Sequence, residues 1–408
     1  MPGVAIECTP ARLPRVGDPG SPFLSMAIYL IVLTCALIHA GFGGAKVALP
    51  LHALHLGVDP FTVGVMMALW ALCPMLIALY VGKLVDRIGA RVPMLAGAIG
   101  VAVALLVPFA FPGIVSLYVM ALAVGTAFQF FFVPIQGITG ALGGPEHRAR
   151  NYSWLAIGFS IASFLGPLIA GFSIDYLGYR MAYLVLALWV IAAAILLFLK
   201  GHLLPDAPAS GPTKEKKPSS FDLLRNGRLR DALIASGLIS VAWDLYLFYF
   251  PIYGHSIGLS ASVIGMVISA FALAVFAIRV ILPRLTQRWS EFQILLYAIG
   301  FAGAVFLLFP LFHNPWLLAA ASFLLGLGCG VGQPMSMSLI YSLAPPGRAS
   351  EGAGLRVTFN HFTHLVVPLA FGGIGTAFGF APVFVSCSAL LIGSSWYGHY
   401  TGRRIKTG

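Results

Sequence analysis

Long apolar stretches separated by short polar breaks cover most of the chain. A helix needs about 20 mostly apolar residues to cross a bilayer, and windows of that size give about twelve candidate spans here. The breaks carry turn residues, as in Gly57-Val58-Asp59-Pro60. The pattern therefore predicts an all-α integral membrane protein. Its spans are expected to begin near Phe23, Phe61, Val92, Ile114, Ser153, Arg180, Asp231, Ser262, Glu291, Pro315, Gly354 and Ala381.

The longest polar stretch lies midway along the chain and is rich in proline and lysine, which is typical of a flexible linker. It divides the predicted spans into six and six. The expected organisation is a cytoplasmic tail at 1–22, a six-helix bundle at 23–200, a cytoplasmic linker at 201–230, a second six-helix bundle at 231–402 and a cytoplasmic tail at 403–408.

Composition supports a membrane protein, because 59% of the 408 residues are hydrophobic and only 9% are charged. A soluble protein is about a quarter charged. This excludes a soluble enzyme, a nucleic-acid-binding domain, a coiled coil and a disordered chain. The net charge of +11 comes largely from basic residues in the even-numbered breaks and at both ends of the chain. By the positive-inside rule we expect both termini to be cytoplasmic, with no nucleic-acid partner.

The two predicted bundles align with each other at a shift of about 200 residues. Because any two membrane spans share apolar residues by chance, matched glycines, prolines and basic residues are the better evidence. Parallel six-span halves related by an axis along the membrane normal are typical of one large class of transporters. The matched pairs are Pro50 and Pro251, Gly57 and Gly258, Gly64 and Gly265, Pro134 and Pro334, and Arg148 and Arg348.

Two short motifs carry a resemblance to a known family. The loop after the second span matches the pattern G-x-x-x-D-R-x-G-x-[RK], and it resembles the signature loop of the major facilitator superfamily. In the fifth span, Gly166-Pro167 resembles a motif associated with antiporters of that family, with alanines replacing two flanking glycines. The resemblance covers residues 23–400. The residues that match the signature loop are Gly82, Asp86, Arg87, Gly89 and Arg91.

This resemblance implies a fold of two pseudo-symmetric six-helix bundles and transport of a small molecule by alternating access. In the family the loop aspartate, here Asp86, latches the cytoplasmic side shut against a neighbouring helix; a solvated basic loop is the simpler alternative. Gly166-Pro167 should bend the fifth span, as a structural kink or with an antiporter-specific role. We expect a monomer that needs no cofactor. We expect it to cross the plasma membrane many times, and that membrane to be the inner membrane of a bacterium.

Two charged residues lie well inside predicted spans, Lys46 in the first and Asp244 in the seventh. An ionised side chain at the centre of a membrane helix costs about 2.5–3.5 kcal/mol, so such residues usually face a cavity. The internal alignment sets Asp244 opposite Gly43, one helical turn from Lys46, and we expect the two side chains to lie within reach of each other. Three roles are open for these residues. They could form a gate pair, Lys46 could bind an anion while Asp244 carries a proton, or the two could be a static structural ion pair.

Span eleven carries Arg356, Asn360 and His364 at a four-residue spacing, which places them on one helix face. A guanidinium suits a carboxylate or phosphate; the alternative is that Arg356 extends to the cytoplasmic interface. Most aromatic residues around Asp244 are expected to face lipid or to pack. Two interpretations are open for Gln129, Gln136 and Gln333. Their side chains form neutral hydrogen bonds to a substrate, or they form hydrogen bonds that pack one helix against another.

Three functions are compatible with this inventory. The first is a proton-coupled secondary transporter of a small organic solute. An anionic or zwitterionic solute is favoured because the membrane spans contain two basic residues and one acidic residue. The second is a multidrug/proton antiporter for apolar or cationic compounds. The third, an integral-membrane enzyme, finds no catalytic motif in the chain. The histidine pairs at 52/55 and 361/364 have no third ligand nearby, so no metal site is expected.

Overall fold

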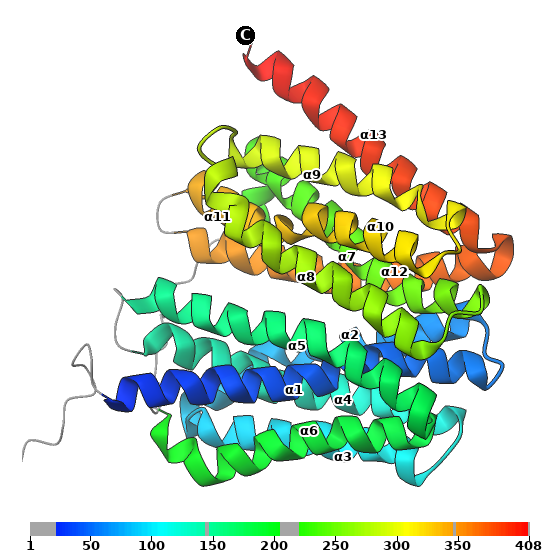
Figure 1. The fold of residues 1–408 in the computed structure, drawn as a ribbon. Coiled ribbons are helices and arrows are strands. Elements are labelled where there is room, and N and C mark those ends of the chain that lie inside the picture. The colour runs from blue at the N-terminus through cyan, green and yellow to red at the C-terminus, as the bar shows by residue number, and fades with distance from the viewer. Residues whose placement is uncertain (1–21, 143–146, 205–219, 346–347, 407–408) are drawn as a thin grey trace, which may run out of the picture.

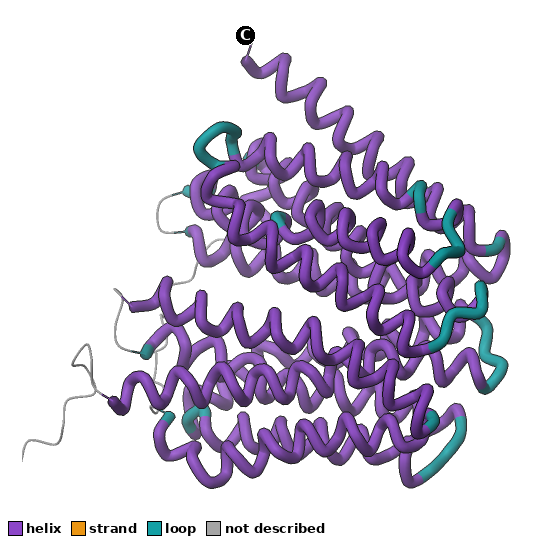
Figure 2. Tube along the Cα trace, viewed as in Figure 1, coloured by secondary structure: helices purple, strands orange, loops and turns teal. Residues whose placement is uncertain are grey.

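The structure is a computed structural model that describes residues 22–142, 147–204, 220–345 and 348–406. Within these ranges the chain is helical and contains no strand (Figure 2). Twelve helical segments in the described chain are long and apolar enough to cross a membrane, which confirms the predicted number of spans. An even number of crossings returns both ends of the described chain to the same side.

The first six spans form one bundle, with α1 central and α3 and α6 on the outside (Figure 1). Asp59 caps the start of α2, and its carboxylate accepts hydrogen bonds from the backbone N–H groups of Phe61 and Thr62. Gly89 ends α2 with a φ of 80°, so a glycine is required at that turn. The bounds are α1 Pro22–His55, α2 Pro60–Ile88, α3 Arg91–Ala110, α4 Ile114–Ala141, α5 Arg148–Leu177 and α6 Tyr179–Lys200.

The last six spans form the second bundle. Side chains of Asn226, Ser260, Ser290 and Asn314 cap its first four helices, as expected for these residue types. Helix α7 begins at 227, inside the range expected for the linker, and α13 continues past 402. The bounds are α7 Gly227–Ser256, α8 Ala261–Leu285, α9 Glu291–Phe306, α10 Pro315–Gly330, α11 Gly332–Leu343, α12 Ala349–Phe378 and α13 Phe380–Lys406; short 3-10 turns lie at Gly201–Leu203, Ser220–Arg225 and Phe309–Leu311.

Span ten is divided in two, because α10 ends at Gly330 and α11 begins at Gly332. Its counterpart in the first half, α4, carries the matching Pro134 but runs without a break. Two glycines beside Pro334 weaken the helix further, since glycine is poorly helix-forming and proline lacks an N–H donor. The halves therefore share a pattern of spans but differ at this position.

The two halves meet through α5 against α8, α2 against α12, and α1 against α7. Small residues make the first two contacts close: Gly171 faces the backbone of Ala261, and a Cβ on Gly372 would lie 2.9 Å from the carbonyl oxygen of Pro60. These residues lie near the odd-numbered connections, at the right of Figure 1, where the halves converge. We call this the closed end, and the opposite end, which carries the N-terminus of α1, the terminal end.

Candidate functional site

Asp244 of α7 is joined to α12 by two contacts. One oxygen of its carboxylate lies 2.7 Å from Nδ1 of His364, and the other accepts a hydrogen bond from the Thr363 hydroxyl at 3.2 Å. The Asp244 side chain is 9% exposed and that of His364 is 39% exposed, so the pair connects a nearly buried acid to a more accessible imidazole. Thr363 has no charge and no motif, and sequence analysis missed it.

The other two residues of the predicted stripe also contact neighbouring helices. The Ser240 hydroxyl on α7 donates to the Asn360 side-chain oxygen at 3.1 Å, and Arg356 donates to the Ser336 hydroxyl on α11 at 3.3 Å. All three side chains therefore project toward the same side of α12, as their spacing requires. Arg356 is only 4% exposed, so its side chain is enclosed by neighbouring helices.

Two arginines in the described part of the second half have a buried guanidinium nitrogen without a partner. The Nε atoms of Arg356 on α12 and Arg279 on α8 are buried, and neither has a hydrogen-bond partner. Sequence analysis did not select Arg279. A buried, incompletely paired guanidinium is costly in isolation, and an anion would satisfy it.

Lys46 of α1 lies at the junction of the two halves. Its Nζ is 5.0 Å from the centre of the Phe42 ring, a cation–π arrangement. It lines a cavity of about 80 Å³ together with Trp243 of α7. Lys46 and Asp244, both described residues, form no ion pair with each other, although Asp244 acts electrostatically on the lysine. The residue directly beside the aspartate is His364. The cavity is completed by Gly43, Val47, Ser163, Pro167, Leu247, Ile268, Phe271 and Ala272.

An aromatic cluster that sequence analysis missed extends from Phe42 into the first half. Phe42 stacks on Phe128 with ring centres 3.9 Å apart, and the His39 ring lies 4.5 Å from Phe159 and 4.8 Å from Phe128. Nδ1 of His39 is buried without a partner. Around Asp244 most aromatic side chains pack rather than face lipid: Tyr246, Phe248, Tyr249 and Phe250 are buried.

The three glutamines differ in their surroundings. Gln129 follows Phe128 in the aromatic cluster and is buried, with 6% of its surface exposed. Gln136 is half-buried, and its backbone oxygen accepts a hydrogen bond from the Tyr152 hydroxyl at 3.0 Å. Gln333 is exposed at the start of α11. No side-chain hydrogen bond joins any of these three described residues to another helix.

The residues of the signature loop lie at the terminal end, away from the contact between α2 and α12. Asp86 and Arg87 are exposed, and a Cβ on Gly82 would meet no atom within 4 Å. The close approach of these helices lies instead near Gly64 and Gly372. Arg91 donates a hydrogen bond to the backbone oxygen of Phe198 at 3.4 Å, which holds α3 against α6.

Gly166 and Pro167 serve two different contacts. A Cβ on Gly166 would lie 2.7 Å from the backbone oxygen of Ala40, so this glycine brings α5 against α1 within the first half. Pro167 lies inside α5, and its backbone oxygen faces Gly265 of α8 in the other half. The Gly-Pro motif therefore sits where the two halves meet.

Two carboxylates join the halves at the closed end, and sequence analysis selected neither. Asp175, at the end of α5, accepts hydrogen bonds from the backbone N–H groups of Ala261 at 3.0 Å and Ser262 at 2.8 Å, so it covers the N-terminus of α8. On the other side of the interface, the Thr376 hydroxyl of α12 lies 3.4 Å from Asp59 and accepts a hydrogen bond from the N–H of Phe61 at 3.0 Å. Hydrogen bonds, first of all from the Thr62 hydroxyl, lower the pKa of Asp59.

The two histidine pairs make different contacts, and Asp244 lies beside His364 of the second pair. The rings of His361 and His364 are 6.1 Å apart, and His52 stacks on Tyr179 at 5.0 Å. No group of three His, Cys, Asp or Glu residues in the described chain is arranged to hold a metal ion.

The sequence matches the profile described as "Major Facilitator Superfamily" over residues 31–362 and 233–400. The chain belongs to the major facilitator superfamily. Among relatives of this superfamily member, the "Multidrug resistance protein MdtG" of Proteus mirabilis (strain HI4320) is 26% identical over 400 residues, covering 92% of this chain and 96% of the relative. The MdtG of Salmonella typhimurium is 25% identical over 386 residues, 91% of this chain and 94% of that one.

Solved structures of transporters share the fold. A POT family transporter in complex with 5-aminolevulinic acid superposes with a TM-score of 0.79 at 14% identity, covering 93% of this chain and 96% of that one. The peptide transporter POT in complex with sulfate gives 0.78 at 15% identity, covering 93% and 94%. This superfamily member is therefore a multi-pass membrane transporter of small molecules, with the predicted two-bundle fold.

Proposed function

We propose that this transporter moves a small organic anion or zwitterion by alternating access and couples the movement to protons. The observation that carries the proposal is the charge balance between the helices. Lys46, Arg279 and Arg356 lack a paired carboxylate, whereas Asp244 is joined to His364. An anion that leaves water needs a replacement charge partner in a medium of low dielectric constant, and these cations supply it. We also propose that the terminal end is cytoplasmic, that the protein works as a monomer, and that it has no enzymatic activity.

Protons would act at the Asp244–His364 pair. With the imidazole protonated and the carboxylate ionised, the pair is a charge-assisted bond between α7 and α12. Adding a proton to the carboxylate, or removing one from the imidazole, replaces this bond with a weaker one. Helix α12 also contacts α2 across the interface at the closed end. The protonation state of the pair therefore biases how α12 is held and which end of the molecule opens.

The coupling is tested with Asp244→Asn and His364→Gln in proteoliposomes. Proton-driven accumulation of substrate should fall at least tenfold in both variants, while exchange of labelled for unlabelled substrate continues, because exchange needs no net proton movement. Asp231→Asn, at the exposed start of α7, is the matched control and should behave as wild type. Undiminished accumulation by folded Asp244→Asn would exclude this carboxylate as the proton site.

Substrate charge is tested by binding to wild type, Lys46→Gln, Arg356→Gln and Arg356→Lys, each scored also for folded yield. For an anionic substrate both glutamine variants should weaken binding about tenfold, which corresponds to roughly 1.4 kcal/mol. Arg356→Lys should be intermediate, because lysine keeps the charge and loses the planar fork. Unchanged affinity with lower yield would assign Arg356 a purely structural role.

A multidrug/proton antiporter is the second candidate function. Relatives named for multidrug resistance cover nearly the whole chain, and the aromatic cluster around Phe42 and Phe128 offers surfaces for apolar compounds. This function predicts that cationic dyes bind better to Lys46→Gln than to wild type, since a positive charge is removed, and that Phe128→Ala weakens their binding. If the substrate is an anion, Lys46→Gln should instead bind that substrate more weakly than wild type does.

A further inference from the structure

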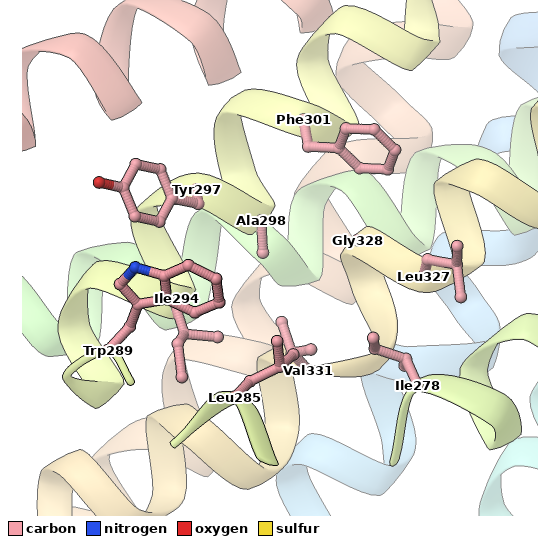
Figure 3. Close-up of a pocket in the computed structure, with 10 residues that line it drawn as sticks. All are labelled: Ile278, Leu285, Trp289, Ile294, Tyr297, Ala298, Phe301, Leu327, Gly328 and Val331. Atoms are coloured by element: carbon pink, nitrogen blue, oxygen red, sulfur yellow. The ribbon is translucent and has the colours of Figure 1, made fainter. Parts of the chain in front are cut away.

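A groove lies between α8, α9 and α10 of the second half, well separated in sequence from Lys46 and Asp244 (Figure 3). Its volume is about 420 Å³, and Leu285, Ile294 and Leu327 are among the apolar side chains that line it. Gly328 forms part of the wall without a side chain. The volume is that of a small-molecule pocket, and the lining offers no charged group to a polar solute.

The groove opens toward the face that lipid covers. Trp289 and Tyr297 at its edge are 44% and 52% exposed, and Phe301 is 42% exposed. Val280 and Ile281 on the same helix as Leu285 are exposed as well. In a chain with twelve crossing segments, such an apolar outer face lies against acyl chains. Tryptophan and tyrosine are typical of the boundary between the acyl chains and the headgroups.

Basic residues stand at one end of this groove. Arg284, in the last turn of α8, and Arg288, in the turn after it, are exposed and are the sequence neighbours of the lining residues Leu285 and Trp289. The backbone N–H groups of Arg288 and Trp289 both bond to the Leu285 oxygen at 3.1 Å, which keeps the turn compact. The acidic residue that follows, Glu291, is bonded to Ser338 on α11. Two exposed basic residues therefore lie next in the chain to lining residues of the groove.

We propose that this groove binds one anionic phospholipid. One acyl chain lies along Ile278, Leu285 and Leu327, and the phosphate lies at Arg284 and Arg288. Basic pockets between membrane helices recognise such headgroups through charge, and the apolar wall adds the burial of methylene groups. The assignment is independent of the transported substrate, because no residue of the proposed substrate or proton pathway takes part.

Native mass spectrometry of the purified full chain tests the headgroup contact. Wild type should retain one phosphatidylglycerol molecule more tightly than phosphatidylcholine. Arg284→Gln/Arg288→Gln should weaken phosphatidylglycerol binding about tenfold, as the loss of two basic contacts implies, with little effect on phosphatidylcholine. The control Arg225→Gln/Arg228→Gln removes two exposed charges elsewhere in the same half and should bind as wild type. An equal loss in both double variants would reduce the effect to general surface charge and overturn the proposal.

Fluorescence tests the position of the acyl chain. Subtracting the emission of Trp289→Phe from that of wild type gives the emission of the Trp289 indole at the groove. Phosphatidylglycerol brominated on its acyl chains should quench this emission. Arg284→Gln/Arg288→Gln should lose this quenching at the same lipid concentration. Strong quenching of the other tryptophans with none assigned to Trp289 would show that lipid does not occupy the groove. Equal quenching by brominated phosphatidylcholine would refute the preference for an anionic headgroup.

Discussion

Three polar side chains along α12 are bonded to neighbours within the second half. His364 contacts Asp244, Asn360 contacts Ser240, and Arg356 contacts Ser336. Inside a membrane an unsatisfied polar group costs several kcal/mol, because no water replaces the missing bond. These bonds therefore attach α12 firmly to α7 and α11, and its contact with α2 is the part that can separate when the halves move.

The Asp59 cap gives a prediction at this scale. Its pKa is lower in the folded chain than its ordinary value of 3.8, so its stabilising contribution is complete above that value and is lost as the pH falls through the folded pKa. Asp59→Ala should cost about 1 kcal/mol at pH 7, and its deficit relative to wild type should shrink as the pH approaches 3. Thermal unfolding in detergent at several pH values measures the difference. Asp59→Asn keeps an acceptor oxygen and should recover most of the loss at pH 7; a deficit of Asp59→Ala that is constant with pH would contradict this account.

At the scale of elements, a side chain of one half completes a helix of the other. Asp175 supplies hydrogen-bond acceptors to the first N–H groups of α8, which have no partner within their own helix. The negative charge of the carboxylate also interacts favourably with the positive N-terminal end of the helix dipole. The interaction exists only while α5 and α8 are together at the closed end. It therefore stabilises one conformation of the transporter relative to the other.

Asp175→Ala should shift the protein toward the conformation that is open at this end. A loss of about 1 kcal/mol changes the ratio of two conformations roughly fivefold. Spin labels on the exposed residues Phe111 and Leu311, one in each half, measure the distance across the closed end. The longer distance should gain population in Asp175→Ala, whereas Asp222→Ala, an exposed acid at the other end, should leave the distribution unchanged. An unaltered distribution in Asp175→Ala would show that the cap does not govern closure.

The glycines of the interface give a second prediction for the same helices. Added methyl groups on Gly171 or Gly265 would collide with backbone atoms of Ala261 and Pro167, which flexible side chains cannot relieve. Gly265→Ala should therefore reduce transport by at least tenfold at normal folded yield, because the closed end no longer closes. Gly137→Ala is the control, since a Cβ there meets nothing within 4 Å. Wild-type transport by Gly265→Ala would mean that the contact is dispensable.

At the scale of the whole molecule, the halves touch at one end and diverge at the other, which fits a rocking motion about the centre. A second label pair on Lys200 and Tyr341 reports on the terminal end. Under conditions that support transport, the distance across the terminal end should shorten in the same fraction of molecules in which the distance across the closed end lengthens. Independent changes at the two ends would contradict rigid-body rocking.

Much of this arrangement follows from the sequence, and some of it does not. The apolar windows predict the spans, and the four-residue spacing of Arg356, Asn360 and His364 predicts their common face. The internal alignment sets Asp244 near the level of Lys46, but an alignment gives a level along the helices and no distance. His364 reaches Asp244 from within the same half, and that contact depends on how α7 and α12 pack. Asp175 is an acid at a helix end like several others, and only the tertiary structure shows which N-terminus it covers.

The interruption of span ten has a consequence for the exchange of backbone hydrogens. In α4 the helix continues past Pro134, so the proline removes one bond of the hydrogen-bond ladder while the helix on both sides stays in one piece. At Gly330 and Gly332 the ladder is interrupted, and Gln333 beside them is exposed. Deuterium should therefore enter a peptide covering 330–336 faster than the matching peptide around Pro134, although both lie within spans. Faster exchange in the 330–336 peptide would indicate that the second half deforms locally, while the first half moves as a rigid unit.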